Sequence, residues 1–166
     1  MKKIILLSDT HNSLDNRFIP YFKNADEIWH AGDIGDIKII DQLRKYAKVR
    51  AVWGNIDDHI VRTEFKETLY FKCENMKIMM THIGGYPGKY VNRILSIIEQ
   101  AQPDVFISGH SHILKVIFDK KNKLLHMNPG AIGNFGIHLV KTILSFNIER
   151  NKIKDLNIIE FPRNKN

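Results

Sequence analysis

The chain has 166 residues, of which 43% are hydrophobic and 26% are charged, and its formal net charge is +7. These values predict a single globular domain over residues 1–166 with a substantial core. The one cysteine, Cys73, excludes an internal disulfide and a cysteine-rich zinc site. No apolar stretch is long enough to cross a bilayer, and residues 4–7 (IILL) are too short for a secretory signal, so we expect a cytoplasmic location.

The positive charge is scattered along the C-terminal region and does not gather on one helix face. The basic residues there alternate with Asn, Ile and Leu: Arg150, Lys152, Lys154, Arg163 and Lys165. We therefore expect no dedicated nucleic-acid surface and no membrane contact. The expected partner is a small-molecule substrate, and homo-oligomer formation stays open.

Strand and helix patterns alternate through the first two thirds of the chain. In chain order we expect a strand at 3–8, a helix at 16–24, a strand at 27–31, a helix at 37–46, strands at 49–53, 68–73 and 77–81, a helix at 89–101 and a strand at 104–108. The last helix has the clearest pattern, because Val91, Ile94, Leu95 and Ile98 follow the spacing of a buried stripe and Pro103 ends it. This alternation predicts parallel strands with helices on the sheet faces.

The C-terminal part of the chain reads as two β-hairpins. Residues 115–119 and 124–128 flank the polar turn 120–123, and residues 138–149 are followed by a second strand at 152–161. Hairpins add antiparallel strands to the parallel ones. The sequence therefore predicts an α/β fold of two packed mixed β-sheets flanked by helices.

Five of the apolar runs end in side chains that can bind a metal ion. In an open α/β sheet, ligands bind at the carboxyl ends of the strands, so these side chains are expected to converge. Two carboxylates, four imidazoles and one amide are too many for one tetrahedral zinc, and they suit a pair of ions such as Mn²⁺, Fe²⁺ or Zn²⁺. The seven candidate ligands are Asp9, His11, Asp33, Asn55, His82, His110 and His112.

The local spacing of these residues supports the same interpretation. Asp9 and His11 are two residues apart, which in extended chain places both side chains on one side, and His110 and His112 repeat this spacing. Glycine precedes Asp33, Asn55 and His110, where it permits a sharp turn and a close backbone approach.

The ordered motifs resemble the signature blocks of the calcineurin-like metallophosphoesterases. The blocks are Asp9-Thr10-His11, Gly32-Asp33-Ile34-Gly35-Asp36, Gly54-Asn55-Ile56-Asp57, Thr81-His82 and Gly109-His110-Ser111-His112. Small size, Asp57 and the Asn128-Pro129-Gly130 turn are most similar to the compact bacterial and archaeal phosphodiesterase branch, to which a non-catalytic subunit of the eukaryotic retromer is related. The resemblance implies a four-layer αββα sandwich.

The resemblance also implies how the ligands divide and what they do. One ion would be held by Asp9, His11, Asp33 and His112, and the other by Asp33, Asn55, His82 and His110. The residues expected to act in catalysis are Asp9, Asp33, Asn55, His82 and His110. A hydroxide that bridges the two ions would attack a phosphodiester. Mn²⁺ is the expected metal, with Fe, Zn, Ni or Co as alternatives.

The general acid is not identified by these motifs. Larger members of the family carry a histidine directly after the asparagine of the third block, where this chain has Ile56. His59, His138 and a metal-bound water are the remaining donors, with surface or structural roles favoured for the two histidines.

Three further residues are expected to support the ligands. Asp36 and Asp57 are placed to orient metal-bound histidines, although Asp36 fits the N-cap of the next helix equally well. His30 is expected to be buried support.

Two other functions compete with a phosphodiesterase, namely a phosphomonoesterase and a non-catalytic binding protein of the same fold. Because all seven ligand positions hold competent residues, the sequence favours an enzyme. It contains no P-loop and no nucleophile elbow. Loops 59–67 and 83–89 are expected to set the specificity.

Overall fold

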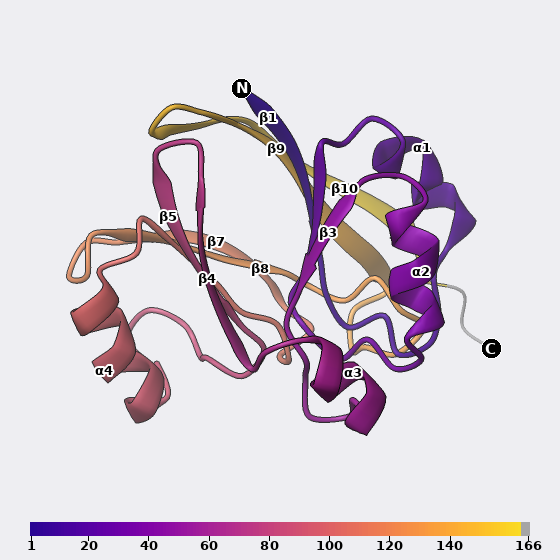
Figure 1. Cartoon of the computed structure of the whole chain (residues 1–166), viewed down its shortest axis with the longest axis horizontal. Helices are drawn as coiled ribbons and strands as arrows, with labels where there is room; N and C mark the ends of the chain where they lie inside the picture. The colour runs from indigo at the N-terminus through magenta and orange to yellow at the C-terminus, as the bar shows by residue number, and fades with distance from the viewer. Residues whose placement is uncertain (164–166) are drawn as a thin grey trace.

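The computed structural model describes residues 1–163 and contains two five-stranded β-sheets (Figure 1). The first sheet has the order β10-β9-β1-β2-β3, with β1 at Lys2–Leu7, β2 at Glu27–His30, β3 at Lys48–Ala51, β9 at Val140–Glu149 and β10 at Lys152–Pro162. The second has the order β4-β5-β6-β8-β7, with β4 at Thr68–Cys73, β5 at Met76–Thr81, β6 at Val105–Ile107, β7 at Leu114–Asp119 and β8 at Leu124–Pro129. The expected α/β fold of two mixed sheets is confirmed.

Each sheet combines a parallel centre with antiparallel additions. Strands β1, β2 and β3 pair in parallel, as do β5, β6 and β8, whereas β9, β10, β4 and β7 pair antiparallel to their neighbours. The two C-terminal hairpins, β7–β8 and β9–β10, lie in different sheets. Parallel strands of one sheet end at the same edge, so the loops after β1, β2 and β3 are neighbours, and so are those after β5 and β6.

Helices cover the outer faces of the sheets, and the largest core cluster lies between them. Trp29, Met80 and Phe146 belong to the inner cluster, which draws on both sheets. Helices α1 (Ile19–Phe22) and α2 (Lys38–Arg44) pack on the outer face of the first sheet, and α4 (Asn92–Ala101) packs on the second (Figure 1). This gives four layers. Within residues 1–163, no helix combines the length and the apolar character needed to cross a membrane.

Helix α3 (His59–Glu64) was not expected, because residues 59–67 read as a loop. It is six residues long and buries only Val61, so the sequence contains no hydrophobic stripe that would predict it. Its N-cap is Asp58, whose carboxylate accepts hydrogen bonds from the Ile60 and Val61 amides.

Two other helix predictions were wrong in extent. The helix predicted at 89–101 begins at Asn92, because Val91 is its extended N-cap, and the Val91 side chain is exposed instead of buried. The helix predicted at 16–24 is a 3₁₀ turn, Asn16–Phe18, followed by the single turn of α1.

Candidate metal centre

The structure brings the strand-end histidines and aspartates to one place. Asp9 and His11 follow β1, Asp33 follows β2, His82 follows β5, and the pair His110 and His112 follows β6. Their ligand atoms form two groups, Asp9 with His11 and His112, and Asp33 with His82 and His110, and within each group these atoms lie within 4.8 Å of one another.

The two-residue spacing had suggested an extended backbone at these residues, but their backbone is not extended. Five of them have positive φ angles: Asp9 58°, His11 44°, Asp33 55°, His110 67° and His112 58°. Non-glycine residues rarely adopt this region, and where they do the cost is of order 1–3 kcal/mol per residue. The chain therefore turns sharply after β1, β2 and β6. His110 and His112 belong to different groups, whereas Asp9 and His11 share one.

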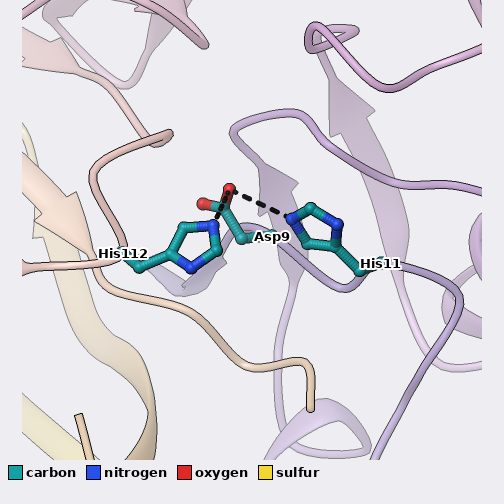
Figure 2. A group of neighbouring side chains, drawn as sticks. All are labelled: Asp9, His11 and His112. Carbon is teal, nitrogen blue, oxygen red and sulfur yellow. Dashed lines mark ion pairs between the residues drawn. The ribbon is translucent and has the colours of Figure 1, made fainter. Parts of the chain in front are cut away.

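The first group centres on one oxygen of Asp9 (Figure 2). Asp9 Oδ1 lies 3.1 Å from His112 Nε2 and 3.8 Å from His11 Nε2. The other oxygen, Oδ2, accepts a hydrogen bond of 3.3 Å from the His110 amide, which ties the loop after β6 to the loop after β1. Asp9 thus offers one free oxygen to a ligand and uses the other to fix the site.

The second group centres on Asp33 and His82. Asp33 Oδ1 lies 3.2 Å from His82 Nε2, and the rings of His82 and His110 meet edge to face with centroids 5.2 Å apart. The His82 Nδ1 atom donates to the Ala31 carbonyl at 2.7 Å. Because this bond places the proton on Nδ1 of a neutral imidazole, the Nε2 lone pair is directed at the acidic residues.

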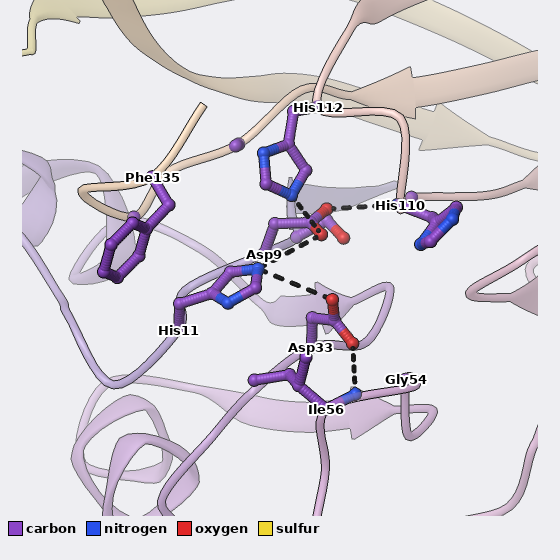
Figure 3. A network of polar contacts seen from close by, with 12 residues as sticks. Asp9, His11, Asp33, Gly54, Ile56, His110, His112 and Phe135 are labelled. Carbon is purple, nitrogen blue, oxygen red and sulfur yellow. Dashed lines mark hydrogen bonds and ion pairs between the residues drawn. The ribbon is translucent and has the colours of Figure 1, made fainter. Parts of the chain in front are cut away.

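Asp33 connects the two groups (Figure 3). Its Oδ2 atom lies 3.5 Å from His11 Nε2 of the first group, whereas Oδ1 faces His82 of the second. The Ile56 amide donates to Oδ1 at 3.1 Å and holds the carboxylate in this orientation. A carboxylate with one oxygen toward each of two ligand groups has the geometry of a bridging ligand.

Buried atoms without partners show that these residues suit a cation. Asp9 Oδ1, His11 Nε2 and His82 Nε2 are buried and make no hydrogen bond within residues 1–163. Buried polar atoms are normally satisfied, because an unsatisfied one costs about 1–3 kcal/mol. Carboxylate oxygens and imidazole nitrogens are also the donors that Mn²⁺, Fe²⁺ and Zn²⁺ accept. The residues therefore fit the divalent metals expected from the sequence.

The electrostatics keep both carboxylates ionised. Burial favours the neutral form of Asp9, but the neighbouring His11 and His112 rings outweigh burial and hold its pKa below the usual range. Burial acts the same way on Asp33, and His82 reverses it, so the pKa of Asp33 is also lowered. Two adjacent negative charges in a buried site are stable only beside positive charge, which protons on histidines or bound cations can supply.

His30 supports the site and is not placed to bind a metal. It is fully buried, its Nδ1 accepts from the Gly32 amide at 3.1 Å, and its Nε2 lies 3.0 Å from Thr10 Oγ1. Burial lowers the pKa of His30 to about 3, so the ring stays neutral. It fastens the loop after β1 to the loop after β2, as the sequence predicted.

Asp57 and Asp36 do not orient histidines. Asp57 is buried, and its two oxygens accept hydrogen bonds of 2.7 Å from the Gly35 and Gly54 amides, so it joins the loops after β2 and β3. Asp36 accepts from the Lys38 amide at the start of α2, but the N-cap of this helix is Ile37, so the alternative prediction of Asp36 as the N-cap is wrong by one residue. The carboxylates of both residues accept hydrogen bonds from backbone amides, and the spacing of side chains in the sequence does not reveal such contacts.

Asn55 and Ile56 occupy the loop after β3. Asn55 is exposed, and it lines a small cavity together with His82, while its carbonyl accepts from Arg62. The chain comes very close to the carboxylate here, because a Cβ added to Gly54 would lie 2.2 Å from Asp33 Oδ1. Ile56 contributes its amide, and its side chain is 44% exposed.

The two candidate acids differ in position. Both are exposed, but His138 lines a cavity with His112, whereas His59 begins α3. His138 is therefore the one of the two that shares a cavity with a candidate ligand.

Phe135 also belongs to this region, although no motif in the sequence indicates it. Its ring meets the His11 ring edge to face at a centroid distance of 5.8 Å, and its side chain is 64% exposed (Figure 3). The Arg163 guanidinium donates to the carbonyls of Gly133, Phe135 and His138 and fixes this loop beside the centre.

The sequence and the fold are similar to those of known proteins. A probable metallophosphoesterase of Methanocaldococcus jannaschii is 33% identical over 132 residues, which cover 76% of this chain and 66% of that protein. A structure described as a novel archaeal phosphodiesterase superposes with a TM-score of 0.72 at 20% identity and covers 96% of this chain and 99% of its own. Vps29 of Entamoeba histolytica, complexed with Zn²⁺, gives 0.74 at 19% identity, covering 98% and 99%.

These structural likenesses show a shared fold, and the family follows from the sequence itself. The model of the calcineurin-like phosphoesterase superfamily domain matches residues 1–151. With that match covering most of the chain, and with its strand-end ligands gathered in the two groups described above, the protein belongs to the calcineurin-like metallophosphoesterases, a family of metal-dependent hydrolases.

Proposed function

We propose that this protein is a phosphodiesterase that uses two divalent metal ions, of which Mn²⁺ is the first to test. The observation that carries the proposal is the placement of Asp33, with one oxygen toward each of two ligand groups. Two bound ions would stabilise the charge of the phosphoryl transition state and lower the pKa of water enough to supply a nucleophile near neutral pH.

The residues divide between the two sites around Asp33. We assign Asp9, His11 and His112 to one ion and Asn55, His82 and His110 to the other, with Asp33 shared. The support for this division is the grouping of ligand atoms and, for Asn55, the cavity that it shares with His82.

The chain itself contributes positioning more than proton transfer. The Ala31 carbonyl orients His82, the Ile56 amide orients Asp33, and the His110 amide orients Asp9. These bonds use backbone groups of the same loops that carry the ligands, so the ligand set is preorganised by the turns after the strands. Phosphoryl transfer depends mainly on such positioning and on charge neutralisation.

Ile56 is the reason to prefer a diester over a monoester. It occupies the place of the histidine that protonates the leaving group in larger relatives, and it offers only an amide that already bonds Asp33. The structural likeness to an archaeal phosphodiesterase supports the same preference.

A non-catalytic binding protein is the second candidate. Three strongly exposed apolar side chains, Phe135, Ile137 and Leu139, stand in one loop beside the centre, and such a surface suits a protein partner. The likeness to Vps29 favours the same interpretation.

The test is a metal-supplemented screen of the purified protein with bis(p-nitrophenyl) phosphate, p-nitrophenyl phosphate and cyclic nucleotides. We expect a diester to be hydrolysed faster than the monoester, and hydrolysis to stop when a chelator removes the metal. A preparation that binds divalent ions yet cleaves none of these esters would refute the enzyme and support the binding protein.

A further inference from the structure

A cavity of about 180 Å³ adjoins the second ligand group. It lies between the loop after β5, the loop after β6 and strands β7 and β8, and its wall includes Tyr86, His110, Ser111, Lys115 and His126. A water needs roughly 10–15 Å³ by this kind of measure, so the space holds on the order of ten waters or a compact organic group. Because His110 forms part of the wall, a phosphoester held at the ligand groups has a neighbouring space for one of its ester arms.

Lys115 gives this cavity an uncompensated positive charge. Its Nζ atom lies 3.7 Å from the centroid of the Tyr86 ring, and within the described residues no carboxylate forms an ion pair with it. The contact with the ring face fixes the ammonium without neutralising it. The charge is also felt by buried His126, whose pKa is lowered to about 4 first by burial and then by Lys115.

The one acidic residue on the same strand is already engaged. Asp119 accepts hydrogen bonds from the Tyr90 hydroxyl at 3.0 Å, from the Lys121 amide at 2.9 Å, and from both the amide and the side chain of Asn122. These donors hold its carboxylate at the β7–β8 turn. The Lys115 ammonium group therefore contacts the face of the Tyr86 ring, and Asp119 does not neutralise its charge.

The remaining wall combines apolar surface with one available hydroxyl. Tyr86, Ile83 and Ile113 supply the apolar part. Ser111 Oγ accepts from the Ile113 amide at 3.2 Å and from Asn128 Nδ2 at 3.1 Å, so its own proton is free to be donated. A cavity whose apolar wall carries a positive charge and a hydroxyl donor suits an organic group that ends in an anion.

We propose that this cavity binds an ester arm carrying a second negative charge, with Lys115 as its counter-ion. The inference rests on the proposed function and narrows it, because the preferred substrate becomes a phosphodiester with a carboxylate or a further phosphate on one arm. Lys115 is a specificity-determining residue in this account, and Ser111 donates to the same anion.

Three matched p-nitrophenyl alkyl phosphodiesters test the proposal, with arms of equal length that end in a phosphate, a carboxylate or a neutral amide. Their kcat and KM are compared in the wild type, Lys115→Met, Lys115→Arg and Lys120→Met, at one ionic strength and saturating Mn²⁺. Lys120 is an exposed lysine at the end of the same strand and outside the cavity, which makes Lys120→Met the matched control.

We expect the wild type to favour a charged arm, and Lys115→Met to lower kcat/KM for that arm about 10-fold through KM, the size of one charge-assisted contact. The amide arm should change less than about twofold on the same basis. Lys115→Arg should retain the preference. A higher rate for phosphate than for carboxylate identifies the anion as phosphate, and the reverse identifies carboxylate.

Binding separates failure of this inference from failure of the proposed function. Calorimetry with the non-hydrolysable phosphonate analogues of the three esters should show the same order of dissociation constants and the same loss in Lys115→Met. Equal affinities for the three arms, or an equal loss in Lys120→Met, would overturn the inference even if the diesters are hydrolysed. Absence of hydrolysis would refute the phosphodiesterase, and the three affinities would then decide the inference alone.

Discussion

Asp33 differs from the other acidic residues of the centre because its two oxygens face different ligand groups. Oδ2 lies 3.5 Å from His11 Nε2 and Oδ1 lies 3.2 Å from His82 Nε2. Asp9, by contrast, presents one oxygen to its histidines and commits the other to a backbone amide. A change at Asp33 should therefore weaken both ions at once.

We expect Asp33→Asn to lower diesterase activity by at least about 10²-fold, because a bridging ligand should matter more than outer partners, whose loss costs 10–100-fold. The measurement is kcat/KM at saturating Mn²⁺, together with the bound metal per chain. Asp36→Asn is the matched control, since Asp36 is exposed and its carboxylate contacts the amide and the side chain of Lys38 at the start of α2. Wild-type turnover in Asp33→Asn would show that the bridging assignment is wrong.

The leaving group should depart without a positioned side-chain acid. Ile56 cannot donate a proton from its side chain, and positioned acid catalysis is typically worth about 10²–10⁴-fold. Rates of the wild type should therefore fall steeply as the pKa of the leaving group rises, and Ile56→His should flatten the series. If the wild-type series is flat and becomes steep in His138→Ala, then His138 is the acid. The same result in His59→Ala would identify His59.

At the scale of elements, the ligands are held by ties between the loops that follow the strands. Asp57 joins the loops after β2 and β3 through the Gly35 and Gly54 amides. Asp58, the next residue, caps α3 instead. These neighbours differ in function although both accept two backbone hydrogen bonds.

Asp57→Asn should lower the free energy of unfolding by about 1–3 kcal/mol and weaken Mn²⁺ binding, because the new amide group faces an N–H donor inside a buried site. Denaturant unfolding and metal titration measure the two effects. Asp58→Asn is the control, and it should be nearly neutral because asparagine caps helices as well as aspartate does. Equal losses in the two variants would contradict a special role for Asp57.

Glu27 ties three strands of the first sheet together. It is buried on β2, and it accepts hydrogen bonds from Lys2 on β1, Arg50 on β3 and Trp29. Burial raises its pKa, but these donors outweigh burial and lower the value from 4.5 to about 2. A carboxyl whose pKa is lowered by folding stabilises the protein above its unfolded pKa and loses that contribution as the pH falls through the folded one.

The wild type should therefore have a higher free energy of unfolding than Glu27→Gln. The difference should reach its full size above about pH 4.5, on the order of 3 kcal/mol by the size of the pKa change, and should decrease as the pH falls toward 2. Unfolding curves at several pH values measure it. Glu149→Gln, which removes an exposed ion pair with Lys154, is the control and should change stability little. A constant difference between wild type and Glu27→Gln from pH 7 to 2 would refute this role.

The sequence predicted the strands and the gathering of candidate ligands at their ends because both signals are local. Each apolar run ends where the buried strand ends, and the next polar side chain sits at the common edge of the sheet, as at Asp33 and His82. Helix α3 was missed because its six residues bury only one side chain, and the aspartate at its N-cap is a weak sequence signal for a helix. The sharp turns at Asp9 and His110 were missed because a two-residue spacing of ligands looks the same in the sequence whether the backbone is extended or in a left-handed turn.

Features built from distant segments could not be read from the chain. Phe135 reaches His11, and Lys115 reaches Tyr86, only in the folded chain, because each contact joins segments that are far apart in the sequence. The role of Asp57 depends on backbone N–H groups, which all residues except proline have and which no sequence motif indicates. Residue identity therefore indicated the metal chemistry, while the packing determined the surroundings in which a substrate would bind.

At the scale of the whole molecule, two sheets bring their strand ends to a common centre. The first sheet supplies Asp9, His11 and Asp33, and the second supplies His82, His110 and His112. Each ligand group contains residues from both sheets, so bound metal would link the sheets. A centre shared in this way depends on the native packing of the inner core.

In the function we propose, two metal ions act together in the hydrolysis of a phosphodiester. The most direct test measures the rate of bis(p-nitrophenyl) phosphate hydrolysis against the number of Mn²⁺ ions bound per chain, counted by elemental analysis during a titration of metal-free protein. We expect a stoichiometry of two, with most of the activity appearing as the second site fills. A stoichiometry that stops at one, or full activity with one ion bound, would contradict it.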